Sequence, residues 1–223
     1  MLTFGRQVYA VLAKDALIER RTKDAVSAML VFSLLVLVTF NFALDLRTEI
    51  MSAVGPGVLW TAVLLGSTLG LGRTFAIERE QGTLDGLLMA PLDRSALYVA
   101  KLLGNVGLMA IVLLVSVPLF AVLFDVALNP GPLLIILALG TLGFAAVGTL
   151  FSAIASHTRA REVMLPVLLF PVIVPILIGV VQATGLALGS TTARDMPWLS
   201  LLLGFDAIYV SLGALTFGHA LED

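Results

Sequence analysis

Long runs of apolar residues, separated by short polar stretches, dominate the chain. A helix rises about 1.5 Å per residue, so roughly 20 apolar residues cross a hydrocarbon core about 30 Å thick. Six segments reach that length and are predicted to be transmembrane helices: 25–44, 58–77, 102–124, 133–155, 163–181 and 198–217. The pattern therefore predicts an all-α, polytopic membrane protein with six spans.

Composition supports the same class. Of the 223 residues, 59% are hydrophobic and 13% are charged, with a mean hydropathy of +1.06, whereas charged residues approach a quarter of a soluble domain. The absence of cysteine excludes disulfides, thiolate metal sites and a cysteine nucleophile. The first apolar run follows a charged segment and no small-residue cleavage pattern follows it, so we expect the first span to stay as an anchor.

The 24 residues before the first span form a separate unit, and residues 25–223 form the membrane domain. On a helical wheel this unit has an apolar side and a basic side, which predicts a helix lying in the membrane interface. The apolar side carries Phe4, Val8, Val11, Leu12 and Ile18, and the basic side Arg6, Lys14, Arg20 and Arg21. Asp15 and Glu19 interrupt the apolar side, so a merely solvated basic lead-in that sets orientation stays as the alternative.

Positive charges are strongly biased to one side of the predicted membrane. Arg47 and Arg194 fall on one side, and all the other lysines and arginines of the chain on the opposite side. Since cytoplasmic loops are enriched in Lys and Arg, both termini and the 73–101 loop are predicted to be cytoplasmic. Arg73 is expected near the end of the second span, and Trp60 and Trp198 at the outer interface.

The loop between the second and third spans is the longest charged stretch between two spans. Its leucines recur at helical spacing, and we expect an amphipathic helix of one to two turns that begins at a Thr83 cap and stops at Pro91. The leucines in question are Leu84, Leu87 and Leu88. Docking onto a soluble protein and lying on the lipid surface explain this helix about equally well. Asp93 is expected to cap the helix that leads into the third span.

Within the spans, Asp206 and Asn105 are the polar residues that need an explanation. A carboxylate at the centre of a span costs about 3 kcal/mol on insertion scales, which marks Asp206 for function by default. The alternative is a structural role, in which Asp206 accepts a hydrogen bond from Tyr209, Asn105 or another span. Asn105 is placed for a close contact between helices. Three prolines in the fifth span, Pro166, Pro171 and Pro175, predict a kinked or broken helix.

Motifs for independent catalysis are missing from the sequence. It has no Gly-x-x-x-x-Gly-Lys-Ser/Thr stretch, no His-Glu-x-x-His and no Gly-x-Ser-x-Gly. An enzyme acting alone is therefore not expected, and the chain cannot build a phosphate-binding loop of that type. The two histidines, His157 and His219, fall at the cytoplasmic edge, so we assign neither as a ligand, and no cofactor or metal is expected on this chain.

A resemblance to a known family adds to these expectations. The run Phe75-Ala-Ile-Glu-Arg-Glu-Gln-Gly-Thr-Leu-Asp-Gly-Leu-Leu-Met-Ala-Pro-Leu-Asp-Arg-Ser95 resembles the haem exporter protein B family, the B subunit of the cytochrome c maturation system. Its first half also resembles type 2 ATP-binding-cassette exporter permeases. In such permeases the lead-in helix, here residues 4–21, lies at the cytoplasmic interface of the inner membrane, and the loop, here 78–94, docks on the ATPase. The residues expected to dock are Glu78, Arg79, Glu80, Gly82, Thr83, Leu84, Leu87, Leu88, Pro91, Asp93 and Arg94.

The resemblance also implies an assembly. It comprises a cassette ATPase subunit, a second copy of this chain, a haem-handling C subunit and a small D subunit. A haem chaperone would be an indirect partner. The assembly would contact membrane lipid, and no nucleic acid is expected as a partner. Haem would be a substrate of the complex in c-type cytochrome biogenesis, exported or released to its chaperone in a step driven by ATP. The rivals are a type 2 permease for a lipid, glycan or drug, and a membrane scaffold that transports nothing.

Overall fold

A computed structural model describes residues 3–44, 48–75, 78, 82, 86, 89, 92–156, 161–189 and 197–220. Within these ranges it places only the backbone at 48–52, 161–163 and 219–220. The described part of the chain is helical, with no strand. The all-α expectation is therefore confirmed.

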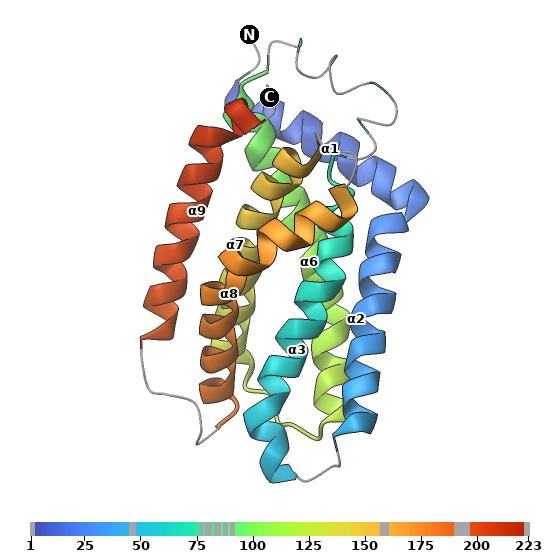
Figure 1. Cartoon of the computed structure of the whole chain (residues 1–223), viewed down its shortest axis with the longest axis vertical. Helices are drawn as coiled ribbons and strands as arrows, with labels where there is room; N and C mark the ends of the chain where they lie inside the picture. Colours follow the sequence, from blue (N-terminus) through green and yellow to red (C-terminus); the bar gives the residue numbers. More distant parts are fainter. Residues whose placement is uncertain are drawn as a thin grey trace.

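One helix lies along one side of a bundle of six longer helices, near the end of the bundle. This first helix, α1, spans Phe4–Thr22, and the bundle consists of α2 (Asp24–Ala43), α3 (Thr48–Leu71), α6 (Arg94–Leu123), α7 (Pro130–Ser156), α8 (Arg161–Ala187) and α9 (Trp198–Ala220). Successive bundle helices run up and down, so both termini lie at the end that carries α1, called the α1 end below (Figure 1).

Each of the six bundle helices is long and apolar enough to cross a membrane, which confirms the six predicted spans in the described residues. Their outward faces expose large apolar side chains, such as Leu114 at 75% and Leu215 at 76%. Exposed apolar surface of that extent is unfavourable in water and suits lipid. The chain is therefore a multi-pass membrane protein.

Four predicted boundaries were wrong by six residues or more. The helix of the second span begins at Thr48 rather than at residue 58, and that of the fifth span ends at Ala187 rather than at residue 181. The second span ends at Leu71 rather than at residue 77, and Arg73 lies beyond it in a turn, where Nη1 is 3.8 Å from Asp24 Oδ2. The third span begins eight residues before its predicted start, because Asp93 Oδ1 accepts a 2.9 Å hydrogen bond from the Ser95 backbone N–H and caps α6. As a result, α6 carries Lys101 into the bundle.

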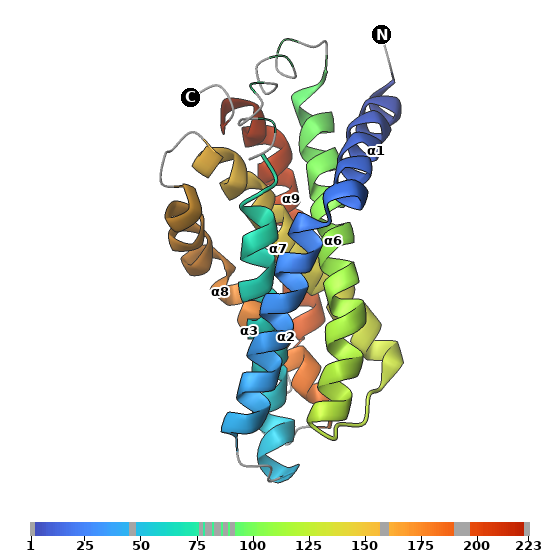
Figure 2. The same cartoon turned by 90° about the vertical axis from the view of Figure 1, so that its right-hand side faces the viewer.

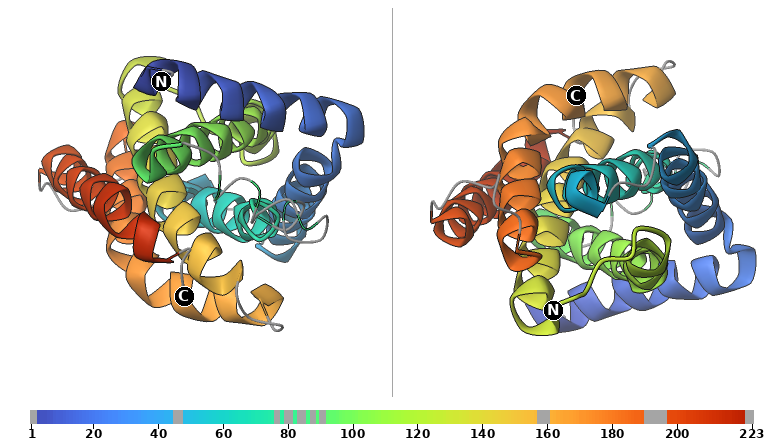
Figure 3. Two further views of the ribbon diagram at one scale, coloured as in Figure 1. Left: turned by 90° about the horizontal axis from the view of Figure 1, so that it is seen from above. Right: turned by 90° about the horizontal axis from the view of Figure 1, so that it is seen from below.

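The connection between α1 and α2 is a single residue. Lys23 has φ of 57° and serves as the C-cap of α1 and the N-cap of α2. Across this turn, Glu19 Oε1 accepts a 2.8 Å hydrogen bond from the Val26 backbone N–H and so satisfies one of the free donors at the start of α2. Seen from above, α1 runs along one side of the bundle past α6 to α2 (Figure 3).

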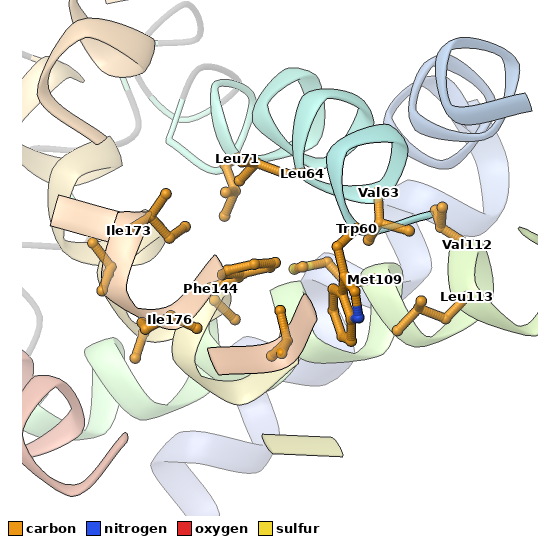
Figure 4. Packing of buried hydrophobic residues seen from close by; sticks show 14 of the residues in the cluster. Trp60, Val63, Leu64, Leu71, Met109, Val112, Leu113, Phe144, Ile173 and Ile176 are labelled. Atoms are coloured by element: carbon orange, nitrogen blue, oxygen red, sulfur yellow. The ribbon is translucent and has the colours of Figure 1, made fainter. Parts of the chain in front are cut away.

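Aromatic and aliphatic side chains from all seven helices form the core, and Figure 4 shows its central part, made by α3, α6, α7 and α8. Trp60 is fully buried there, with its ring 5.6 Å from the Phe144 ring in an edge-on arrangement, and its Nε1 donates a 2.8 Å hydrogen bond to Thr184 Oγ1. The prediction of an interfacial Trp60 was therefore wrong. Its indole N–H is satisfied by a buried hydroxyl instead of by water or headgroups. Trp198, at the start of α9, is half-buried.

The Gly66-x-x-x-Gly70 pair of α3 packs inside the protomer. A Cβ at Gly66 would meet Ser33 Oγ and lie 2.7 Å from the Met29 carbonyl oxygen, and one at Gly70 would meet the Met29 side chain. Glycine at both positions lets α3 approach α2 closely, and Ser33 Oγ donates a 3.0 Å hydrogen bond to the Ala62 carbonyl across this contact.

The three prolines of the fifth span lie within one helix, α8, which is bent but not broken. Its first half crosses the bundle obliquely and its second half follows the bundle axis (Figure 1). Each proline lacks a backbone N–H and clashes with the preceding turn, which accounts for the change of direction.

Candidate functional site

Four charged side chains meet at the α1 end, where the chain leaves α3 and enters α6. Lys101 Nζ lies 2.6 Å from Glu78 Oε1 and 3.0 Å from Asp15 Oδ2, and it also donates to the Thr74 carbonyl oxygen at 2.9 Å. Lys14 Nζ lies 2.7 Å from the same Glu78 oxygen and 3.1 Å from Asp15 Oδ1. We call Lys14, Asp15, Glu78 and Lys101 the charge cluster.

Burial makes the charge cluster different from a surface ion pair. The Lys101 side chain is 3% exposed and that of Glu78 is 7% exposed. Two cations and two anions balance, and each ammonium has two carboxylate partners, which is the condition for a buried ion pair to persist. The Lys101 ammonium also lies 5.0 Å from the centre of the Phe75 ring, a favourable cation–π distance.

The charge cluster shifts the pKa values of Glu78 and Lys14. Burial alone would raise the pKa of Glu78, but the charge and hydrogen bond of Lys101, with those of Lys14, outweigh it and lower the pKa below 4.5. Burial alone would likewise lower the pKa of Lys14, but the hydrogen bond to Glu78 and the charge of Asp15 raise it above 10.5. Both groups are therefore charged at neutral pH.

The geometry of α1 explains why these charges turn inward. The face of α1 that meets the bundle includes Gln7 and Val11, which are buried, and Lys14 and Asp15 follow at helical spacing on the same side. Placing Lys14 on the outer, basic side of α1 was wrong, because its ammonium reaches Glu78. Asp15, which interrupts the apolar side in the sequence, faces Lys101.

Helix α1 also holds the other end of the 78–94 loop. The Asp93 backbone N–H donates a 3.1 Å hydrogen bond to Gln7 Oε1, while Lys14 holds Glu78. Gln7 and Lys14 are seven residues apart, about 10 Å along the helix. The two ends of the loop are thus tied to one rigid helix, which lies beside the start of α6 (Figure 2).

Hydrogen bonds continue from the charge cluster into the spans. Thr74 Oγ1 donates to Asn105 Oδ1 at 3.1 Å, and Asn105 Nδ2 donates to Thr149 Oγ1 at 2.8 Å. Asn105 thereby joins α6 to α7 and to the segment after α3. A polar path therefore runs from the loop through Thr74 to a third helix.

Asp206 is buried in α9 with 3% of its surface exposed, and among the described residues neither carboxyl oxygen has a hydrogen-bond partner. The expected hydrogen bond to Asp206 from Tyr209, Asn105 or another span is not formed in the described residues. Tyr209 donates to the Val172 carbonyl oxygen at 3.3 Å, and Asn105 donates to Thr149. Asp206 lies in α9, a helix that contributes no residue to the charge cluster.

Most of the predicted docking residues lie outside the described residues. They are Arg79, Glu80, Thr83, Leu84, Leu87, Leu88 and Pro91. Of the rest, Gly82 has φ of 64°, a conformation that favours glycine, and Arg94 packs beside Gly218 of α9. The described part of the loop also includes Met89, which is 86% exposed.

In the part of the chain that the structure describes, no group of three His, Asp or Glu side chains could hold a metal ion. His157 and the His219 side chain lie outside that part.

Sequence reasoning missed the partners of Glu78. Lys101 is a lysine within an apolar helical run, and Asp15 is an acid on an apolar helix face. An unpaired charge at either position is costly, so each of these two residues indicated that it has a partner of opposite charge.

Comparison with known proteins decides the family. The model of the family described as CcmB protein matches residues 6–223. The chain belongs to the CcmB family. Among CcmB relatives, heme exporter protein B of Rhodobacter capsulatus is 32% identical over 91% of this chain and 93% of its own length. Heme exporter protein B of Paracoccus denitrificans is 29% identical over 96% and 97%, and that of Escherichia coli K12 is 29% identical over 85% and 81%.

Proposed function

We propose that this chain is the membrane permease of an ABC-type complex that serves haem export or delivery in c-type cytochrome biogenesis. The names of its CcmB relatives support the haem substrate. The excess of Lys and Arg at the α1 end supports a cytoplasmic position for that end and both termini, in a bacterial inner membrane. A cassette ATPase docks there on the 78–94 loop, and the complex includes a second copy of this chain and the C and D subunits.

The charge cluster is the observation that carries this mechanism. A loop that only assembled a complex could be tied to the bundle at a single point, but here α1 holds both Glu78 and Asp93, and Lys101 binds Glu78 and Asp15 from within α6. Movement of the docked ATPase would displace the loop together with α1 and α6. The bonds through Thr74 and Asn105 then pass that displacement to α7.

A crosslinking experiment tests the docking. The chain has no cysteine, so single cysteines at Leu84 and Leu87 can carry a photoactivated crosslinker in native membranes. We expect adducts with the ATPase subunit, and none from a cysteine at Asp125, which is exposed at the opposite end of the bundle. Adducts with phospholipid alone from both leucine positions would overturn the docking.

A second experiment separates transmission from assembly alone. Glu78→Gln keeps the size of the side chain but removes the charge that binds Lys14 and Lys101. We expect the variant complex to assemble with its ATPase and to mature c-type cytochromes at least tenfold less well. Normal maturation by the assembled variant would favour the scaffold. A rate of ATP hydrolysis that is the same with and without the haem-handling partners would favour a permease for a different substrate.

A further inference from the structure

Asp206 has a position that the mechanism above does not use. It is the ninth residue of α9, about 12 Å along the helix axis from Trp198, so it lies deep within the span. Its carboxyl is enclosed by protein, with no hydrogen-bond donor in the described residues. An ionised carboxylate placed in this way would lack both water and a counter-ion, a state that costs several kcal/mol.

Among the described side chains of the neighbouring helices, no charge compensates it. Helices α6, α7 and α8 pack against α9. Helix α7 contains no titratable residue, and α8 has Arg161 and Glu162 only at its start, where side chains are not described. In α6, Tyr98 donates to the Ala146 carbonyl oxygen and Lys101 belongs to the charge cluster. Tyr98, Lys101 and Arg94 all lie in the part of α6 nearest the α1 end. On α9 itself, Tyr209 is committed to α8, and His219 is near the end of the helix.

The fold makes room for the Asp206 carboxyl at one glycine. A Cβ at Gly143 of α7 would lie 2.5 Å from Asp206 Oδ1 and 3.1 Å from Ile176 Cδ1. The carboxyl oxygen thus lies directly against the α7 backbone, a contact that any larger residue would prevent. The enclosure of Asp206 therefore depends on close packing of α9 and α8 on α7.

Helix α9 is also tied to the bent helix. Tyr209, one turn after Asp206, donates to the Val172 carbonyl oxygen, which lies between the second and third prolines of α8. Helices α8 and α9 are thus connected beside the Asp206 carboxyl, and a change in the bend of α8 would move α9 relative to Gly143.

We propose that Asp206 is a proton-binding site, neutral while α9 packs on Gly143, and that its proton passes to water when α8 and α9 move away from α7. The O–H bond breaks heterolytically, leaving the carboxylate in contact with the water that enters, and repacking requires the proton back. Proton occupancy stands on the structure alone, whereas the movement rests on the proposed function.

Infrared spectroscopy of the purified chain tests proton occupancy. We expect a carbonyl band of a neutral carboxylic acid at neutral pH that is missing from Asp206→Asn and present in Asp125→Asn, whose side chain is exposed. Should Asp206→Asn fail to fold, Asp206→Glu should show the band at a shifted frequency. Identical spectra for the folded wild type and Asp206→Asn, or an unshifted band in Asp206→Glu, would overturn the site.

The movement is tested in the assembled complex. A non-hydrolysable ATP analogue is expected to abolish the Asp206 band, and its removal to restore it. In cells, Asp206→Asn is expected to assemble normally and to lower cytochrome maturation at least tenfold, because the side chain cannot release a proton. A band unchanged by the analogue, or normal maturation, would overturn the movement. In either case the loop crosslinks to the ATPase would still report on the proposed function separately.

Discussion

Replacing Lys101 with methionine tests whether the charge cluster holds α1 and the loop on the bundle. The substitution preserves the length of the side chain but removes an ammonium bound to Glu78, Asp15 and the Thr74 carbonyl oxygen. Glu78, which is 7% exposed, would then depend on Lys14, whose side chain is 40% exposed. Removing one partner of a buried pair costs about 3–5 kcal/mol, because the other charge stays buried without compensation. We expect a loss of that size in the free energy of unfolding.

The measurement is reversible unfolding of the purified protein in bicelles, followed by helical circular dichroism. Arg73→Met is the matched control, since Arg73 pairs with Asp24 at 3.8 Å and both side chains are at least half exposed. It should change the free energy of unfolding by about 1 kcal/mol or less. Lys101→Met combined with Glu78→Leu should be more stable than Lys101→Met alone, because the uncompensated carboxylate is gone.

Equal effects of Lys101→Met and Arg73→Met would refute this reasoning. So would a double variant that is less stable than Lys101→Met, since the two groups would then contribute independently.

Three further predictions concern pH and packing. Glu78 has a lowered pKa, so its contribution to stability is complete above pH 4.5 and is lost as the pH falls through its folded pKa. Lys14 has a raised pKa, so its contribution is complete below pH 10.5 and is lost as the pH rises through its folded pKa. When stability is measured against pH, Glu78→Gln should lose less stability than the wild type on the acid side. Gly66→Ala should destabilise the protein by about 1–3 kcal/mol by forcing α3 from α2, whereas Gly107→Ala, which meets nothing within 4 Å, should change stability by less than about 1 kcal/mol in the same unfolding assay. Trp60→Phe should cost about 1–3 kcal/mol by leaving the Thr184 hydroxyl without its donor, and a Thr184→Val change added to it should cost less than it does alone.

Hydrophobic length was enough to predict the six spans, because a lipid-facing helix must be apolar over its whole crossing. It was not enough to predict where a span ends when neighbouring polar groups are satisfied by other helices. Lys101 seemed to mark the edge of a span, but the structure places it inside because Glu78 and Asp15 compensate its charge. The prediction for Trp60 failed for the same reason, since Thr184 supplies the partner that the interface was expected to supply.

The candidate site could be predicted only in part. The sequence drew attention to the loop and to Glu78, but periodicity along one helix does not indicate which other helix a side chain meets. Lys14 illustrates the point. A helical wheel placed it with the basic residues, yet it lies on the side of α1 that meets the bundle, and its ammonium reaches Glu78. Contacts of this kind depend on tertiary packing, which a single sequence does not specify.

The single-residue turn at Lys23 fixes the position of α1 relative to the first span, and the hydrogen bond of Glu19 to the start of α2 holds the same turn. A helix that only floats at a bilayer surface takes its depth from the lipids around it, and its occupancy changes with headgroup charge and thickness. In this protein the position of α1 is set by contacts within the chain. The height of α1 above the hydrocarbon should therefore be the same in membranes of quite different lipid composition.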